Sequence, residues 1–126
     1  MAGVAIGRRQ WAIAEGYIPG TSTGPAPAMI SHETVSILNG TDDVAEVEVI
    51  VYFTDREPVT YRLTVDARRT RHVRFNDLAD PEPIPRDTDF ASVIRSNVPI
   101  VVQHTRLDSR QPANALLTTI AFPGDE

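Results

Sequence analysis

The residues with the greatest chemical potential lie in one stretch, Ile100–Arg110, which begins as an apolar run and ends in closely spaced hydrogen-bonding groups. Alternation along a β-strand places His104 and Arg106 on the same face as apolar side chains, and Gln103 on the opposite face. Because burying an unpaired arginine is costly, the first face must meet a carboxylate, a ligand or another subunit. We therefore expect the functional site on this face.

The three histidines could together form a metal site. His32, His72 and His104 lie in different expected strands and, with Glu33, could form a cupin-like site. The close His-x-His pair of such sites is missing, and an arginine two residues after His72 and after His104 would repel a cation. We favour hydrogen-bonded sheet histidines and predict no metal.

Catalytic motifs have little support in this sequence. Ser109, His104 and Asp108 could form a Ser-His-Asp set, but no nucleophile elbow accompanies them. Walker and dinucleotide-binding motifs are missing, and zero cysteines exclude thiol catalysis and cysteine-based zinc sites. We predict a non-enzymatic protein without a cofactor. The alternative is an enzyme or accessory protein of carbohydrate metabolism that acts on a small polar metabolite.

The aromatic residues near the N-terminus suggest a surface for stacking. Trp11, Glu15 and Tyr17 share one strand parity, and an aromatic ring beside carboxylate, histidine and arginine groups is typical of sugar-binding pockets. Trp11 as an ordinary core residue is the alternative.

The positive charges are all arginine. The chain has twelve cations, no lysine and a net charge of −5, which disfavours general affinity for nucleic acid. Four arginines crowd the segment Ala67–Phe75, but alternation splits them between two faces. We favour a solvated surface or ion pairs with the acidic loop Asp77–Asp89. A DNA-binding regulator remains a further alternative.

At 126 residues the chain fits one domain, 1–126, with several short strands and no long amphipathic helix. Turn signals every 8–12 residues favour an all-β fold, an antiparallel β-sandwich of jelly-roll type. Asn39-Gly40 predicts a hairpin, Pro99 is expected to open a new strand, Asn76–Asp89 an ordered loop and Pro123–Glu126 a frayed tail. The expected strands are Arg9–Gly16, Ser31–Leu38, Val44–Thr54, Val59–Val65, Ala67–Phe75, Phe90–Ser96, Ile100–Leu107 and Ala115–Phe122.

The sequence also bears on location. No apolar run approaches the ~20 residues that span a bilayer. In the segment Met1–Trp11 the charges follow a very short apolar piece, the reverse of a secretory signal. We therefore expect a cytoplasmic protein.

Five long runs of the sequence stand out together: Trp11–Pro19, Ile30–Val35, Arg68–Leu78, Asp87–Val93 and Ser96–Arg110. They resemble one known family, that of the soluble Anabaena sensory rhodopsin transducer. The likeness extends from about Trp11 to Phe122 and departs at Gly20–Ala28, Gly40–Asp43 and the C-terminal tail. The resemblance implies a small cytoplasmic β-sandwich that forms a homotetramer. It further implies a membrane sensory rhodopsin as a partner, a link to DNA binding, and small molecules such as sugars as ligands in the wider family.

The residues and the resemblance together suggest a ligand pocket at a sheet edge or a subunit interface. In the alternative interpretation, Arg106 and Arg110 pair with Glu15, Glu33 or Asp108 to hold the tetramer together. The candidate ligand-binding residues are Trp11, Glu15, His32, Glu33, Asn76, Asp77, Gln103, His104, Arg106, Asp108 and Arg110.

Overall fold

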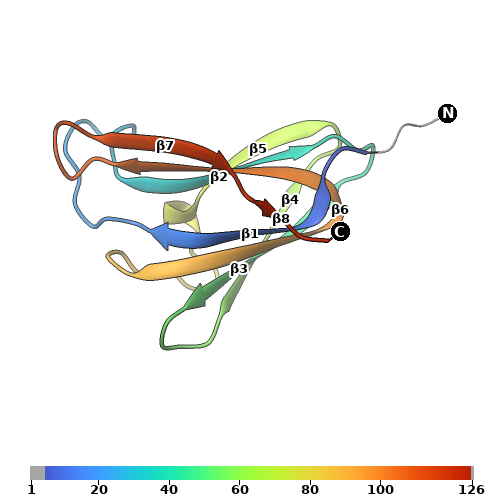
Figure 1. Ribbon diagram of the computed structural model, residues 1–126, viewed down its shortest axis with the longest axis horizontal. Coiled ribbons are helices and arrows are strands. Elements are labelled where there is room, and N and C mark those ends of the chain that lie inside the picture. Colours follow the sequence, from blue (N-terminus) through green and yellow to red (C-terminus); the bar gives the residue numbers. More distant parts are fainter. Residues whose placement is uncertain (1–4, 126) are drawn as a thin grey trace.

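Two layers of antiparallel β-strands make up the fold in the computed structural model, which describes residues 5–125 (Figure 1). A single 3₁₀ turn, Phe75–Asp77, interrupts the strands. The strands are β1 Arg8–Tyr17, β2 His32–Asn39, β3 Ala45–Phe53, β4 Val59–Val65, β5 Arg69–Arg74, β6 Asp89–Asp108, β7 Ala115–Ile120 and β8 Phe122–Pro123.

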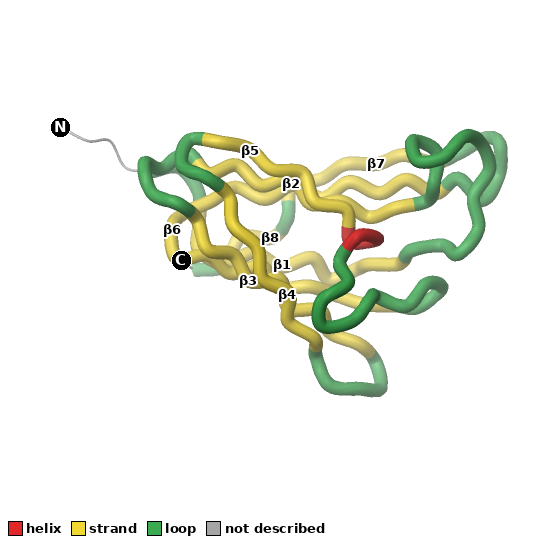
Figure 2. Tube along the Cα trace, turned by 180° about the vertical axis from the view of Figure 1, so that it is seen from behind, coloured by secondary structure: helices red, strands yellow, loops and turns green. Residues whose placement is uncertain are grey.

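One long strand belongs to both layers. The first half of β6 lies in a layer of order β4–β3–β6–β1–β8, and its second half lies between β2 and β7, with β5 beyond β2. Figure 2 shows the two layers from behind, spread apart and joined where β6 bends. Each strand pairing is antiparallel. The prediction of an all-β antiparallel sandwich is confirmed.

The prediction that Pro99 opens a new strand is wrong. Phe90–Ser96 and Ile100–Leu107 are parts of the one strand β6, and the chain bends between them without ending. Ser96 still pairs with β3, whereas Val101 already pairs with β2. Pro99 lies between these two ladders, where its missing N–H costs no hydrogen bond to β3 or β2.

The hairpin predicted at Asn39-Gly40 is also wrong. β2 pairs with β5 and β6, and β3 pairs with β4 and β6, so the turn carries the chain from one layer to the other. The side chain of Asn39 is fully buried, and its Nδ2 donates to the main-chain oxygens of Asp43, Val65 and Asp66 at 2.8, 3.1 and 3.2 Å. This asparagine anchors the crossover between layers.

The core lies between the layers, and Trp11 is part of it. Trp11 is only 5% exposed, and its indole Nε1 donates to the carbonyl oxygens of Arg8 and Ile100 at 3.0 Å each. The bond to Ile100 joins β1 to the bend of β6. Burial of this large apolar ring stabilises the fold, and because its N–H is hydrogen-bonded, no buried donor is left unpaired.

The C-terminal segment differs from the predictions. The strand expected over Ala115–Phe122 ends at Ile120, and the chain steps at Ala121 to the other layer. Phe122–Pro123 form β8 against β1, and the Gly124 N–H donates to the carbonyl of Gln10 at 2.8 Å. The prediction of a frayed tail is therefore wrong for Pro123 and Gly124. Glu126 lies outside the described residues.

The long connection between β5 and β6 is ordered, as predicted. Ile84 is buried, and the hydroxyl of Tyr61 donates to the carbonyl of Glu82 at 2.6 Å. Asp87 fixes the far end, because its Oδ1 accepts from the Gly20 N–H at 2.9 Å. These contacts tie the connection to both β4 and the chain after β1.

Over the described range 5–125, none of the helical structure is long and apolar enough to cross a membrane. Met1–Val4, which contributed to the expectation about location, lie outside the described residues.

Candidate functional site

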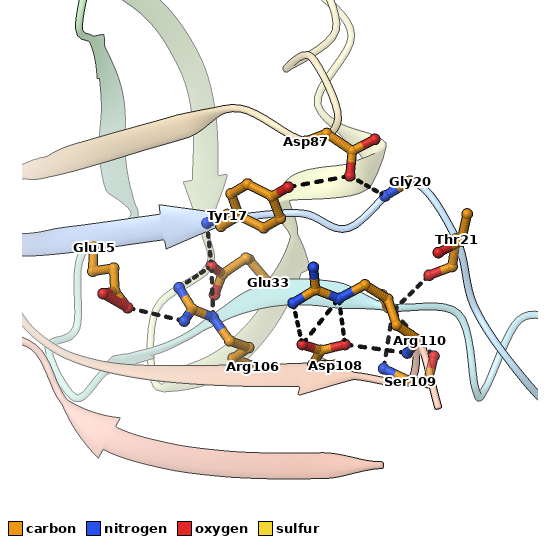
Figure 3. Close-up of polar contacts among 11 residues, drawn as sticks. Glu15, Tyr17, Gly20, Thr21, Glu33, Asp87, Arg106, Asp108, Ser109 and Arg110 are labelled. Carbon is orange, nitrogen blue, oxygen red and sulfur yellow. Dashed lines mark hydrogen bonds and ion pairs between the residues drawn. The ribbon is translucent and has the colours of Figure 1, made fainter. Parts of the chain in front are cut away.

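Three polar side chains meet inside the sandwich. Glu33 of β2 lies opposite Arg106 of β6, and its carboxylate is fully buried. Its Oε2 accepts from Nε and Nη2 of Arg106 at 3.0 and 2.7 Å and from the Tyr17 N–H at 2.6 Å (Figure 3). Its Oε1 accepts from Nε2 of His104. A buried carboxylate is tolerated here because four N–H groups surround it.

The surroundings keep Glu33 and Arg106 charged. Burial alone would raise the pKa of Glu33, but hydrogen bonds from His104, Arg106 and the Tyr17 N–H outweigh it, so the pKa is lowered. Burial would likewise lower the pKa of Arg106, but hydrogen bonds to Glu33 and Glu15 outweigh that effect and raise it. Glu33 and Arg106 therefore form an ion pair at neutral pH.

Glu15 extends the cluster from the other layer. Its side chain is 80% exposed, yet its Oε2 accepts from Nη1 of Arg106 at 3.0 Å. The strand parity that grouped Glu15 with Trp11 fails because the β1–β6 pairing shifts register between Ile13 and Gly16. Trp11 is consequently in the core, while Glu15 reaches Arg106 at the surface. The alternative interpretation of Trp11 as a core residue fits this placement.

A second ion pair lies beside the first. Arg110 donates through Nη2 to Oδ2 of Asp108 at 2.6 Å, and its guanidinium lies 5.6 Å from the centre of the Tyr17 ring. Hydrogen bonds from the Arg110 side chain and backbone lower the pKa of Asp108. The Glu15–Arg106 pair and the Asp108–Arg110 pair border a hollow of about 290 Å³, which we call the polar hollow. Its lining residues are Glu15, Tyr17, Pro19, Asp89, Arg106, Asp108 and Arg110.

A second hollow, the β1–β7 cleft, lies between the edges of the two layers. Its volume is about 310 Å³. Glu15 and Arg106 line both this cleft and the polar hollow, so their ion pair lies between the two. The lining residues of the β1–β7 cleft are Ala12, Ile13, Ala14, Glu15, His104, Arg106, Leu117, Thr119, Ile120, Ala121 and Phe122.

Several predicted site residues do not line either hollow. Gln103 is exposed on the outer face of β6, as its parity predicts, and Asp77 is exposed in the 3₁₀ turn. His32 uses Nδ1 to contact the carbonyl of Ile30 at 2.7 Å. Asn76 supports β2 instead, because its Nδ2 donates to the carbonyl of Ser31 at 2.9 Å. Six of the eleven predicted residues, namely Glu15, Glu33, His104, Arg106, Asp108 and Arg110, come together.

The Ser-His-Asp set considered from the sequence is not assembled in the described chain. The hydroxyl of Ser109 donates to the carbonyl of Met29 and lies 3.1 Å from the Ser31 hydroxyl. His104 contacts Glu33 instead. Across residues 5–125, no group of three or more histidine, cysteine, aspartate or glutamate side chains is placed to hold a metal ion.

The crowded arginines bind main-chain oxygens rather than the acidic loop. Arg71 donates to the carbonyl of Thr64 at 2.7 Å, and Arg74 donates to that of Pro27 at 3.1 Å. Arg68 lies 3.7 Å from the carboxylate of Asp42. In the part of the chain that is described, none of the four forms an ion pair with Asp77–Asp89, so the solvated surface is the better interpretation.

β7 contributes to the site, although none of its residues was predicted from the sequence to do so. All six residues of this strand are exposed, with Leu116 at 68% and Ile120 at 55%. The available signal was the pair Leu116-Leu117, which puts an apolar residue on both faces of an expected strand. An edge strand apolar on both faces lacks the alternation of a half-buried strand and indicates a surface that needs a further contact.

A family model and a solved structure point to the same family. A family model described as Anabaena sensory rhodopsin transducer matches residues 6–123. Among solved structures, Anabaena sensory rhodopsin transducer is 68% identical, with a TM-score of 0.74 over 83% of this chain and all of that chain. Protein 1070 of Thermotoga maritima is 31% identical, with a TM-score of 0.85 over 94% of this chain and 97% of that one. A search of curated proteins finds no match.

Proposed function

Because this chain belongs to the Anabaena sensory rhodopsin transducer family, we propose that it is a non-enzymatic, cytoplasmic signalling protein that responds to a small polar ligand. The family supports a transducer-like role. The ligand and the place where it binds are our proposal, and we assign them to the Glu15–Arg106 ion pair and the two hollows beside it.

One observation carries the proposal: the only exposed partner of Arg106 among the described ion pairs is Glu15, on the other layer. The buried Glu33 accepts two hydrogen bonds from Arg106, so the guanidinium is fixed in place. A polar ligand that replaces Glu15 at this guanidinium would break the side-chain contact between β1 in one layer and the second half of β6 in the other, while the backbone pairing of β1 with the first half of β6 remains. Binding then favours one arrangement of the two layers, provided that the ligand has different affinities for the two arrangements.

The test is thermal unfolding of the purified protein against sugars, sugar acids, phosphates and divalent cations. A ligand at 100 times its dissociation constant stabilises the folded state by about 2.7 kcal/mol if it binds only that state. Arg106→Lys keeps the charge over Glu33 but loses the fixed fork of donors. A shift with one ligand class that this variant loses supports the proposal. No shift with any class contradicts it.

Assembly is a second candidate for the role of the exposed residues. The six exposed residues of β7 favour a homotetramer or a protein partner that covers this strand, and the family suggests a membrane sensory rhodopsin as that partner. In this version the protein is an adaptor, and the ion pairs serve to keep the edge of the sandwich rigid. Binding of detergent-solubilised rhodopsin to immobilised protein, lost on Leu116→Asp, would favour the adaptor.

Catalysis and DNA binding each have a direct test. Turnover of a bound sugar would indicate an enzyme of carbohydrate metabolism. A DNA-binding regulator requires an affinity that falls steeply as salt is raised, because cations are released from the phosphates.

A further inference from the structure

The β1–β7 cleft changes character along its length. On the β6 side, Leu117 of β7 is paired with Arg106, and Ala121 hydrogen-bonds to Val102 through its main chain. Four residues of strand separate these two points, which is about 13 Å. The Arg106 end carries the charges, and the Val102 end is formed by small and apolar residues.

The β1 side of the cleft changes from apolar to charged in the same direction as the β6 side. Ala12 is paired with Phe122 of β8 at the apolar end, and Glu15, three residues further along β1, reaches Arg106 at the charged end. The cleft therefore has one charged end and a mainly apolar remainder, in which His104 and Thr119 are the polar lining residues, in a volume of about 310 Å³. That volume lies at the lower end of those of small-molecule pockets.

The donors of Arg106 are not all used. A guanidinium has five N–H donors; Nε and Nη2 each donate once to Glu33, and Nη1 donates once to Glu15. Glu15 uses one oxygen for this contact, with a side chain that is 80% exposed. The Glu15 carboxylate thus occupies a place that another carboxylate could take with both oxygens.

From this arrangement we propose that the ligand of the β1–β7 cleft is a small monocarboxylate with an apolar body: its carboxylate replaces Glu15 at Arg106 and its body lies along the cleft toward Phe122. This inference rests on the proposed function and names the class of ligand for the same site.

Charge and burial both favour this class. Exchange of one carboxylate for another leaves the charge around Arg106 and Glu33 unchanged, and Glu15 returns to water at little cost because it is already exposed. A sugar in the same cleft would place most of its hydroxyl groups against apolar side chains such as Ile13, Leu117 and Phe122, because beyond the charged end only His104 and Thr119 offer polar side chains among the lining residues. A neutral alcohol would fill the apolar part but leave the guanidinium donors unused.

The test compares four compounds by isothermal titration and thermal unfolding of the full chain: acetate, octanoate, octanol and glucose. Octanoate should bind most tightly, and along a series of chain lengths each added methylene should strengthen binding by up to about fourfold until the cleft is full. Equal affinities for acetate and octanoate, or equal affinities for octanol and octanoate, would overturn the inference.

Variants at exposed positions locate the site without endangering the fold. Glu15→Gln removes the competing carboxylate and should strengthen octanoate binding by up to about fivefold, whereas Glu57→Gln, in the β3–β4 turn, should leave it unchanged. Leu117→Ala should weaken octanoate binding. Leu116→Ala is the matched control, because this neighbour on β7 is 68% exposed and does not line the cleft. Equal effects of Leu116→Ala and Leu117→Ala would overturn the inference.

The outcome also separates this inference from the proposed function. Stabilisation by glucose but not by octanoate would overturn the ligand class and leave a ligand-responsive protein. If none of the four compounds and none of the wider panel stabilises the protein, both proposals fail.

Discussion

Glu33 and Arg106 lie directly opposite each other on β2 and β6, and two N–H groups of the arginine donate to one oxygen of the fully buried carboxylate. His104, two residues before Arg106, contacts the other oxygen. The position of Arg106 at the surface therefore depends on a charge inside the sandwich.

Replacement of Glu33 by alanine should lower the free energy of unfolding by about 3–5 kcal/mol, because the partly buried Arg106 loses the carboxylate that compensates it. Chemical denaturation monitored by circular dichroism measures this loss. Glu15→Ala is the matched control, since it removes the exposed partner of the same arginine and should cost at most about 1 kcal/mol. Similar losses in the two variants would show that the buried pair has no special weight.

Acid should destabilise the protein through Glu33. Its pKa is lowered in the folded state, so on acidification the unfolded state takes up a proton first, and stability present above the unfolded pKa, about 4.3, is lost as pH falls through the folded pKa. Urea midpoints measured from pH 7 to pH 3 should fall in the acid range and stay level with respect to this group above it.

Two variants show which carboxyl group causes the loss of stability in acid. In Glu33→Gln the urea midpoint should fall less steeply with decreasing pH than in the unmodified protein, because residue 33 then has no carboxyl group to protonate. Asp108→Asn should reduce the pH dependence of the urea midpoint less, since the pKa of Asp108 is lowered by an ion pair with the half-exposed Arg110. An equally steep fall of the urea midpoint with decreasing pH in Glu33→Gln and in the unmodified protein would contradict the prediction.

The fluorescence of Trp11, the only tryptophan, tests the stacking hypothesis. A ring that is 5% exposed in the core should emit at the short wavelengths of a buried indole and shift to longer wavelengths on unfolding. Sugars should leave the folded spectrum unchanged, because a sugar cannot stack on a ring inside the core. Saturable quenching by a sugar would instead require that Trp11 be accessible.

The proposed homotetramer should depend on the exposed side of β7. Leu116→Asp puts a charge on a residue that is 68% exposed in the isolated chain, so the fold should tolerate it while an apolar contact should not. Light scattering after size-exclusion chromatography should report a smaller assembly for this variant. Tyr52→Asp, on an exposed position of β3, is the control and should keep the mass of the unmodified protein. A tetramer that survives Leu116→Asp would remove β7 from the interface.

The sequence-based prediction of strands succeeded where alternation was strong and local. β4 has the predicted bounds, Val59–Val65, and the ends of β2 and β3 lie within one residue of those predicted. The predictions at Asn39-Gly40 and Pro99 failed for one reason. Both signals describe local backbone geometry, and neither states which layer the next strand joins.

The candidate site was predictable in part. Parity along β6 correctly placed His104 and Arg106 inward, and the rule that a buried arginine needs a carboxylate correctly implied a partner such as Glu33. The place of Glu15 was not predictable, because a register shift after Ile13 changes the face that it occupies. Such a shift depends on the partner strand and leaves no mark in the pattern of the strand itself.

Because β6 belongs to both layers, it affects the order in which the chain can fold. This strand pairs with β1 and β3 in one layer and with β2 and β7 in the other, and its twenty residues come late in the sequence. Neither layer can therefore close around its central strand until most of the chain has left the ribosome. Pairings between distant segments make folding slow and leave strand edges open in the meantime. Because the two layers share this strand, we expect them to form together, and a nascent chain that stops before Asp89 lacks the central strand of both layers.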